Sequence, residues 1–298
     1  MKFPLVRKIL KAIKKLKAIK ENHLWAPPGA YYSPIPAIKQ IKKDEEKIFG
    51  DMPANLNGIN LQVEDQLKLI TKLAEYYKEL PDWESESKKH LRYKYKNSEY
   101  KYCDAILLFC MIRHLKPHRI IEIGSGFSSC LILDTNELFF DNEIVTNFID
   151  PYPQRLISHL RESDKEKIII SQSRVQDVDL KEFSLLESND ILFLDSSHIC
   201  KTNSDVNHIL FNVLPILSTG VYIHFHDIFY PFEYPKHWVY EGRAWNEAYF
   251  LRAYLSYNND FRIILMNTYM ENFYESFFRE NFPLCFKARG GSIWLRKE

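Results

Sequence analysis

Short apolar runs alternate with longer mixed stretches over the C-terminal two thirds of the chain. Each run has strand length and is bounded by glycine, proline or an acidic residue, which favours a buried strand. Strands that alternate with helices predict an α/β fold with a doubly wound, mostly parallel sheet. The last two runs have no clear helix between them and predict an antiparallel hairpin at one edge. The predicted strands cover residues 119–123, 144–149, 167–171, 190–195, 220–225, 261–265 and 292–296.

The first 100 residues have a different pattern, and we interpret them as a mostly helical extension before a main domain of residues 101–298. Residues 61–80 carry apolar side chains on one helical face. Residues 26–36 hold four prolines, which remove backbone donors and exclude a helix there. Three aromatic residues accompany this loop, either as a cover for an active site or as packing groups: Trp25, Tyr31 and Tyr32.

Residues 2–20 form a basic amphipathic segment. They contain eight lysines or arginines and no acid, and their apolar residues recur at helical spacing. One interpretation is a peripheral membrane helix that meets anionic lipid or an acidic partner. The other, which we favour, is a helix that docks its apolar stripe on its own domain or on a second copy of the chain, giving a homo-oligomer.

Composition narrows the functional classes. The 298-residue chain is 46% hydrophobic, and its net charge of +1 provides no basic field for binding nucleic acid. Five scattered cysteines without a C-x-x-C pair favour reduced thiols and a cytoplasmic location over a disulfide frame or a zinc site. No apolar run approaches the length of a membrane span.

A glycine turn follows the first strand of the main domain. The sequence Glu122-Ile-Gly124-Ser125-Gly126 ends an apolar run, and a helix-compatible stretch follows it. A strand, a glycine turn and a helix in this order present free backbone N–H groups to a ligand. Ser129 stands where a dinucleotide-binding G-x-G-x-x-G sequence has its third glycine, so that fingerprint is absent.

Acidic residues end three of the predicted parallel strands. Asp150, Asp195 and Asp227 each follow an apolar run. The carboxyl ends of parallel strands share one edge of the sheet, and ligands of open α/β sheets bind outside that edge. We therefore expect these three carboxylates to converge on one crevice.

The combination resembles the class I S-adenosylmethionine-dependent methyltransferases, which have a Rossmann-like fold with a closing hairpin. The resemblance covers residues 101–298 and rests on the glycine turn and on the acids that follow the next three strands. The N-terminal extension, with its proline-rich loop, looks like that of bacterial members without an assigned substrate. Ser128 departs from the many members that carry a third glycine there.

The resemblance implies a role for each residue of the cofactor site. Gly124, Ser125 and Gly126 would lie under the methionine and ribose portions of S-adenosylmethionine, and Glu122 would order that region. Asp150 would accept both ribose hydroxyls, because one carboxylate can hold a vicinal diol. The remaining members of the implied set are Gln176 and Asp177, which would face adenine, and Asp195 at the end of the fourth strand.

The acceptor side resembles the metal-dependent O-methyltransferases, including catechol-type and sugar-modifying enzymes. Asp195-Ser-Ser-His198 follows the fourth strand, and His226-Asp227 follows the fifth. The resemblance implies that Asp195, His226 and Asp227 hold a divalent metal, and that Asp195 and His198 act in catalysis, His198 as the general base. Imidazole favours iron, zinc, manganese or nickel over magnesium. The alternative for both histidines is a structural bond to a neighbouring carboxylate.

We therefore expect an enzyme that transfers a methyl group from S-adenosylmethionine to a hydroxyl of a small molecule or sugar. One alternative is a nicotinamide-dependent oxidoreductase, which the missing glycine and the edge hairpin disfavour. Another is a non-catalytic cofactor-binding or assembly protein that acts through residues 2–20. The loop after the fifth strand carries residues that either line an acceptor pocket or form a lid: Tyr230, Tyr234, Trp238, Arg243, Trp245 and Asn246.

Overall fold

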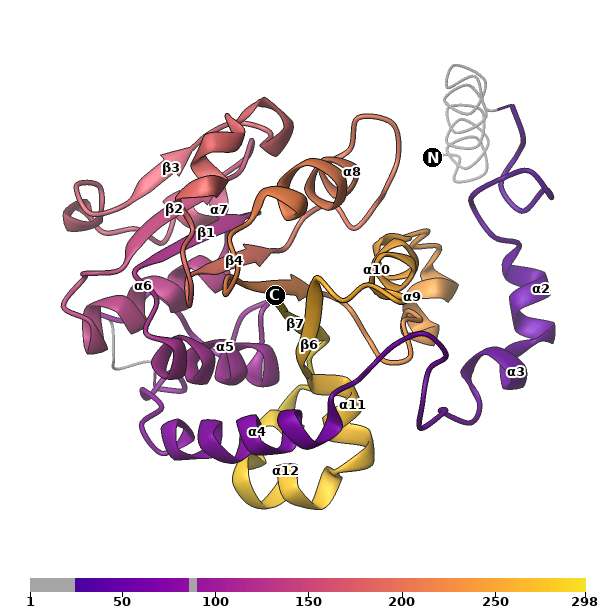
Figure 1. Ribbon diagram of the computed structural model, residues 1–298, viewed down its shortest axis with the longest axis horizontal. Coiled ribbons are helices and arrows are strands. Elements are labelled where there is room, and N and C mark those ends of the chain that lie inside the picture. The colour runs from indigo at the N-terminus through magenta and orange to yellow at the C-terminus, as the bar shows by residue number, and fades with distance from the viewer. Residues whose placement is uncertain (1–24, 86–89) are drawn as a thin grey trace, which may run out of the picture. The chain divides into compact units, whose positions relative to one another are not determined.

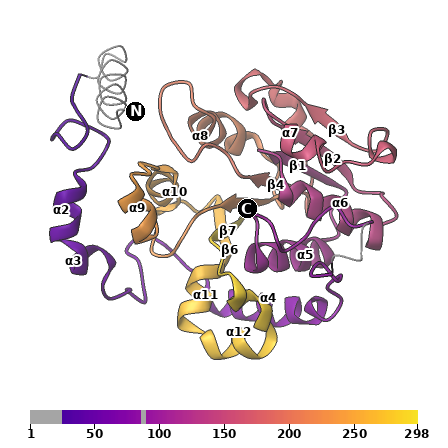
Figure 2. The same cartoon turned by 180° about the vertical axis from the view of Figure 1, so that it is seen from behind.

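The computed structural model describes residues 25–85 and 90–298 (Figures 1 and 2). The basic segment 2–20 lies outside these residues, and its helical character stays a prediction. The chain divides into two compact units, Met1–Met52 with Lys236–Ala244 and Pro53–Pro235 with Trp245–Glu298. Within the described ranges, no helix is both long enough and apolar enough to cross a membrane.

One seven-stranded sheet forms the centre of the larger unit, in the order β3-β2-β1-β4-β5-β7-β6. The first five strands in this order pair in parallel, and β7 pairs antiparallel with both β5 and β6. The predicted α/β fold with an antiparallel C-terminal edge is therefore confirmed. The strands are β1 (Arg119–Ile123), β2 (Val145–Ile149), β3 (Ile169–Ser171), β4 (Ile191–Leu194), β5 (Tyr222–His226), β6 (Phe261–Met266) and β7 (Ser292–Lys297).

The register of the parallel strands brings their carboxyl ends level. Ile123 at the end of β1 pairs with Ile149 of β2 and with Leu194 of β4. All three side chains are buried, as expected for central strands covered on both faces. The residues that follow these three positions are the glycine turn, Asp150 and Asp195, so the acids predicted at strand ends do stand at one edge.

Helices cover the sheet (Figure 1). The helix α4 lies within residues 61–80, where the apolar pattern predicts it, and α6 follows the glycine turn as predicted. The helix α5 is apolar all round and is buried from Cys103 to Ile112, and α4 packs along it and against β6. Two short helices between β6 and β7 were not predicted from the sequence. The helices of the larger unit are α4 (Val63–Tyr77), α5 (Tyr102–Leu115), α6 (Phe127–Phe139), α7 (Gln154–Ile157), α8 (Asp205–His208), α10 (Glu247–Leu255), α11 (Asn267–Phe273) and α12 (Glu275–Asn281).

Short helical turns complete the larger unit. They occur mainly where the chain leaves a strand or prepares to enter the next one. Most of them are 3-10 turns, and η4 is a π-helical turn that continues α8. They are η1 (Glu162–Asp164), η2 (Val175–Asp177), η3 (Leu180–Leu185), η4 (Ile209–Val213), η5 (Leu214–Ile216) and η6 (Pro283–Lys287).

The smaller unit combines segments far apart in the sequence. It contains α2 (Ile38–Lys43), α3 (Glu45–Phe49) and α9 (Lys236–Glu241). The Glu45 carboxylate accepts hydrogen bonds from the Lys236 ammonium group and the Tyr240 hydroxyl. The Phe49 ring meets the Tyr240 ring edge-on at 6.3 Å, so polar and aromatic contacts together join α3 to α9.

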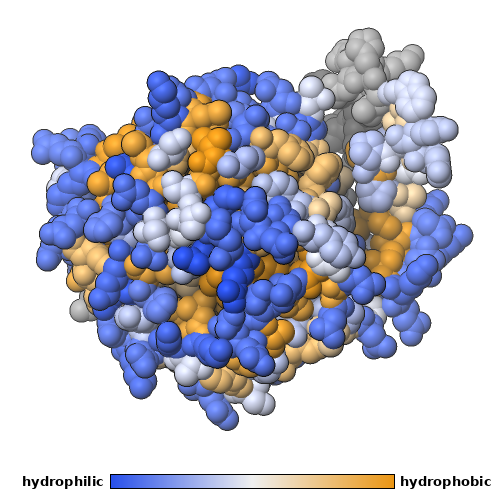
Figure 3. All heavy atoms as spheres, in the orientation of Figure 1, coloured by the Kyte–Doolittle hydropathy of each residue, from blue (hydrophilic) through white to orange (hydrophobic). Residues whose placement is uncertain are grey.

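The proline-rich loop of this unit has no helix, as its prolines predict. Its aromatic residues Trp25, Tyr31 and Tyr32 are 70–94% exposed, and the Tyr32 ring contacts each of the other two with a centroid distance of 5.1 Å. Polar residues cover much of the face shown in Figure 3, and apolar residues gather in patches between them. The five cysteines are buried thiols without a disulfide.

Candidate active site

A cavity of about 700 Å³ opens at the carboxyl ends of β1, β2 and β4. Its size suits a small organic ligand, and its place is the one at which open α/β sheets bind ligands. The wall contains both acidic and basic side chains. It is formed by Ile123, Gly124, Ser125, Ile149, Asp150, Pro151, Tyr152, Arg155, Arg174, Val175, Gln176, Asp195, Ser196, Ser197, Lys201, Asn203, Ser204 and Asp205.

Gly124 is required by the geometry of the turn. Its φ angle is +86°, a region that residues with a side chain rarely adopt. A Cβ atom at this position would also lie 1.8 Å from the carbonyl oxygen of Asp195. The end of β4 therefore packs directly against the turn after β1, and only glycine allows that approach.

Asp150 joins the end of β2 to the same turn. Its Oδ2 atom accepts hydrogen bonds from the backbone N–H and the hydroxyl of Ser125, both at 2.9 Å. Its Oδ1 atom accepts the backbone N–H of Tyr152 at 2.7 Å. The carboxylate is thus fixed at the wall of the cavity, and it retains lone pairs that a ligand hydroxyl could use.

Glu122 lies beneath the turn and does not line the cavity. Its side chain is fully buried and accepts a hydrogen bond from the Ser128 hydroxyl at the start of α6. Burial raises the pKa of Glu122 to about 8, and the nearby charges of Asp195 and Asp150 act in the same direction. The geometry is that of a group that connects β1 to α6 under the cavity.

Of the two residues predicted to face adenine, one lines the cavity and the other does not. Gln176 lines the cavity and donates a hydrogen bond from Nε2 to the backbone oxygen of Asn203 at 2.7 Å. Asp177 is outside the cavity wall and forms a two-point ion pair with Arg174, with distances of 2.7 and 2.9 Å. Arg174 itself lines the cavity, so Asp177 reaches the site through this arginine.

A cluster of two carboxylates and one imidazole adjoins the cavity. The Nε2 atom of His198 is 3.4 Å from Asp195 Oδ1 and 3.5 Å from Asp227 Oδ2. One ligand atom from each residue lies within 4.8 Å of the others. Both His198 and Asp227 have positive φ angles, of 60° and 57°, just after β4 and β5.

Glu247 is a member of this site that the sequence patterns did not reveal. It lies at the start of α10, and its Oε2 atom is 2.8 Å from His198 Nδ1. The side chains of both residues are almost fully buried, at 2% and 6% exposure. The two are 49 positions apart, and no local motif links them.

The carboxylates determine the charge state of this cluster. Burial alone would lower the pKa of His198, but hydrogen bonds with Asp195 and Glu247 outweigh it and hold that pKa well above its usual value. Burial would raise the pKa of Asp195, whereas the neighbouring charges of His226 and His198 bring it below the usual value. The ligand-free cluster therefore favours a protonated imidazole between ionised carboxylates.

The two histidines of β5 lie beside this cluster. His226 Nε2 is 3.6 Å from the second oxygen of Asp227, Oδ1. It is not part of the group formed by Asp195, His198 and Asp227, although it is close enough to act on their charges. His224 is buried and stacks on Phe193 with a centroid distance of 4.2 Å, which fits a packing role.

The six residues singled out in the loop after β5 differ in their burial and in their contacts. Tyr230 and Tyr234 are only 3% exposed, and their hydroxyls bond the backbone of Pro53 and Ala248. The Trp245 ring lies 4.4 Å from the His198 ring, measured between centroids. Asn246 bonds the backbone of Cys200 in both directions. Trp238 and Arg243 belong to the smaller unit, where the guanidinium lies 4.4 Å from the indole centroid.

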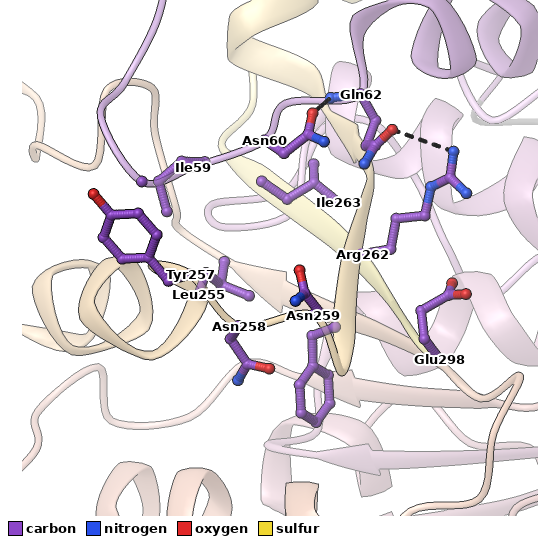
Figure 4. A pocket seen from close by; sticks show the side chains of 12 residues that line it. Ile59, Asn60, Gln62, Leu255, Tyr257, Asn258, Asn259, Arg262, Ile263 and Glu298 are labelled. Atoms are coloured by element: carbon purple, nitrogen blue, oxygen red, sulfur yellow. Dashed lines mark hydrogen bonds between the residues drawn. The ribbon is translucent and has the colours of Figure 1, made fainter.

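A second, smaller pocket lies at the opposite edge of the sheet (Figure 4). It has a volume of about 160 Å³ and is lined by residues from the start of β6, the loop before α4 and the end of α10. Gln62 accepts a hydrogen bond from Arg262 at its rim. The pocket is distant from the strand ends that carry the acids, so the larger cavity is the candidate active site.

Comparisons with known proteins agree with this placement. Residues 121–228 match the family described as "Methyltransferase domain". An uncharacterised protein of Archaeoglobus fulgidus is 39% identical over 166 residues, which cover 55% of this chain and 74% of that protein. The matched domain begins inside β1 and ends just after β5, so it contains the glycine turn and all the strand-end acids.

Among solved structures, similarity extends to an SAH-bound methyltransferase of Podospora anserina. It is 16% identical, with 92% of this chain and all of that chain covered and a TM-score of 0.43. An O-methyltransferase of Streptomyces achromogenes involved in tomaymycin synthesis, in complex with SAM, is 14% identical. There the coverage is 87% of this chain and 96% of that chain, with a TM-score of 0.42.

The matched domain, the strand order and the glycine turn with its strand-end acids all lead to one assignment. The chain belongs to the class I S-adenosylmethionine-dependent methyltransferases.

Proposed function

We propose that this enzyme transfers the methyl group of S-adenosylmethionine to a hydroxyl of a small molecule, with sugars among the candidate acceptors. The observation that carries the proposal is the position of Asp195. This residue lines the cavity and also belongs to the cluster with His198 and Asp227. Asp195 is therefore common to the proposed cofactor site and to the cluster that could take up the acceptor proton or hold a cation.

Residues of the cavity wall would hold each portion of the cofactor. Gly124 and Gly126 allow its methionine and ribose portions to approach the backbone closely. Asp150, already fixed by Ser125 and Tyr152, would accept the ribose hydroxyls. Gln176 lies in the wall where adenine would fit, and Arg174 connects Asp177 to that wall.

The chemistry needs alignment and removal of one proton. The acceptor oxygen attacks the sulfonium methyl group in line, the S–C bond breaks as the O–C bond forms, and S-adenosylhomocysteine leaves. The hydroxyl proton passes to a base, because the neutral hydroxyl is a weak nucleophile. The cluster can help in two ways: His198, once it has lost its own second proton, accepts the hydroxyl proton, or a bound cation lowers the pKa of the hydroxyl.

The residues present fit a divalent cation. Nε2 of His198 and one oxygen each of Asp195 and Asp227 face one another, and a buried carboxylate on the far side of the imidazole is a common companion of metal-binding histidines. Asp195, His198 and Asp227 would hold the ion, with His226 next to Asp227. A bound ion would act as a Lewis acid on the acceptor hydroxyl.

The test combines binding and turnover. Calorimetric titration with S-adenosylmethionine should show saturable binding near one molecule per chain. With a panel of sugars and phenols, mass spectrometry should detect S-adenosylhomocysteine together with an O-methylated product. Methylation only on nitrogen, sulfur or carbon would reject the hydroxyl as acceptor. No binding with or without divalent ions would reject the whole proposal.

Asp150→Ala should weaken cofactor binding about tenfold or more, because charge-assisted hydrogen bonds to the ribose are lost. The control is Asp260→Ala, which removes an exposed carboxylate paired with Lys297 at the opposite edge of the sheet. Calorimetry on both variants measures the dissociation constant for S-adenosylmethionine. An unchanged constant in Asp150→Ala would remove Asp150 from the cofactor site.

A further inference from the structure

We propose that Glu247 is a positioning residue that turns the Nε2 lone pair of His198 onto the gap between Asp195 and Asp227. His198 then serves as a nitrogen ligand, and the site selects a first-row transition-metal ion over Mg²⁺. The inference concerns the site of the proposed methyl transfer and rests on that function. It assigns His198 the role of a metal ligand and not that of the general base.

The pairing of Glu247 with His198 is fixed from several directions. The Glu247 Oε2 to His198 Nδ1 distance is 2.8 Å, and both side chains are buried. The backbone N–H groups of Asn246 and Glu247 donate to the carbonyl oxygen of His198 at 3.1 and 3.2 Å. The Ser196 hydroxyl lies 3.5 Å from the other oxygen of Glu247. The start of α10 therefore holds both the backbone and the ring of His198.

This pairing decides which nitrogen is free. A carboxylate only accepts hydrogen bonds, so Nδ1 of His198 carries the hydrogen that faces Glu247. In the neutral ring Nε2 then has a lone pair, and it faces Asp195 Oδ1 and Asp227 Oδ2. Without an ion, a proton on Nε2 lies between these carboxylates, and a divalent cation that displaces the proton would bind the same three atoms.

The distances suit a metal ion in the gap. Nε2 is 3.4 and 3.5 Å from the two carboxylate oxygens. Ligand atoms bound tetrahedrally at about 2.1 Å from an ion are about 3.4 Å apart, and octahedral neighbours are about 3.0 Å apart. The two distances from Nε2 therefore match those between ligands of one small divalent ion, and the three ligand atoms all lie within 4.8 Å of one another.

The same geometry argues against direct proton transfer to His198. Its side chain is 6% exposed, and the Trp245 ring lies 4.4 Å away. The two carboxylates occupy the directions from which an acceptor hydroxyl would approach Nε2. By contrast, Asp195 is 33% exposed and Asp227 17%, so the carboxylate side of the gap is the side open to ligands.

The donor set determines the ion. Two carboxylate oxygens alone suit Mg²⁺, which prefers oxygen ligands and retains several waters. An added imidazole favours iron, cobalt, nickel or zinc. A carboxylate hydrogen-bonded to the imidazole strengthens this preference, because it makes the ring a better donor and fixes its orientation.

The test uses Co²⁺ and Mg²⁺ alone as probes on the full-length protein. Calorimetry should give Co²⁺ binding at least about 100-fold tighter than Mg²⁺ binding, and Co²⁺ visible absorption should report a nitrogen ligand. Glu247→Gln should lose about 10- to 100-fold in Co²⁺ affinity, with little change in Mg²⁺ affinity. His198→Asn should lose the Co²⁺ preference and change the absorption bands.

Glu271→Gln is the matched control, because Glu271 is another glutamate on a helix with 2% side-chain exposure, bonded to Cys103 instead. It should leave both metal affinities unchanged. Equal loss of Co²⁺ and Mg²⁺ affinity in Glu247→Gln, or an unchanged Co²⁺ affinity in either site variant, would overturn the inference. Binding of S-adenosylmethionine to the wild-type protein is measured separately. If the wild type does not bind it, the proposed function is rejected, whereas the metal preference is still judged from the metal titrations.

Discussion

At the scale of single residues, the glycine turn shows how much one position can determine. The sequence predicts glycines after β1 because a turn must present backbone N–H groups to a ligand. The structure adds that Gly124 touches the carbonyl oxygen of Asp195, which belongs to a different strand. That contact depends on the strand register, and a sequence motif alone does not contain it.

Gly124→Ala should destabilise the protein by about 3 kcal/mol or more, because the Cβ atom meets backbone that cannot move away easily. Gly242→Ala isolates the conformational part of this cost. Gly242 has a similar φ angle of +88°, but a Cβ there would meet nothing within 4 Å. We expect about 1 kcal/mol for that variant. Urea unfolding measures both, and equal losses would contradict the steric argument.

The cluster of Asp195, His198 and Asp227, with its partner Glu247, can be predicted only in part from the sequence. The strand-end pattern places Asp150 and Asp195 correctly at the cavity wall. The pattern of β5 favours His226 beside Asp227, but it is His198, from the segment after β4, that groups with Asp195 and Asp227 in the structure. Glu247 comes from a helix 49 residues beyond His198, and its role depends on tertiary packing alone.

At the scale of elements, apolar runs located every strand to within a few residues. The missed elements include α11 and α12, because the segment between β6 and β7 is rich in aromatic residues without clear helical periodicity. The segment 93–102 is rich in tyrosine and lacks a regular apolar pattern, yet Tyr93 and Tyr100 are buried. A tyrosine can bury its ring while its hydroxyl bonds the backbone, as Tyr93 does with the Tyr100 carbonyl.

Arg92, which lies before α5, connects α6 to η1, and its loss tests how strongly these two elements are held together. Its side chain is 4% exposed and pairs with Asp134 of α6 and Asp164 of η1. The distances from Nη1 to Asp134 Oδ1 and from Nε to Asp164 Oδ2 are both 2.9 Å. Arg92→Met should cost about 3–5 kcal/mol, because buried carboxylates lose their counter-charge. Arg161→Met, at a 35% exposed side chain, should cost less than about 1 kcal/mol.

Chemical unfolding of the two arginine variants in parallel provides the comparison. If Arg92→Met unfolds at the same denaturant concentration as Arg161→Met, the buried network does not hold these elements together.

At the scale of the whole molecule, stability should depend on pH through Glu271. Burial raises its pKa to about 7 from an ordinary value of 4.5. The folded protein therefore binds this proton more tightly than the unfolded chain does. The contribution is complete below about pH 4.5 and is lost as the pH rises through about 7, at a cost of about 3 kcal/mol.

Glu271→Gln should remove this part of the pH dependence, because the amide does not ionise and can still accept the Cys103 thiol. Free energies of unfolding for the wild type and the variant are compared from about pH 5 to about pH 8. The wild type should lose stability relative to the variant over that interval. Parallel curves would show that Glu271 ionises normally in the folded protein.

The division of the chain has a consequence for how the gene can be shortened. Lys236–Ala244 is inserted between segments of the larger unit, yet it clusters with the first 52 residues. A fragment that starts at residue 53 would still encode α9 but would lack Glu45 and Phe49, its partners. Expression trials should therefore remove both segments together, with a short linker in place of the insertion, or remove neither.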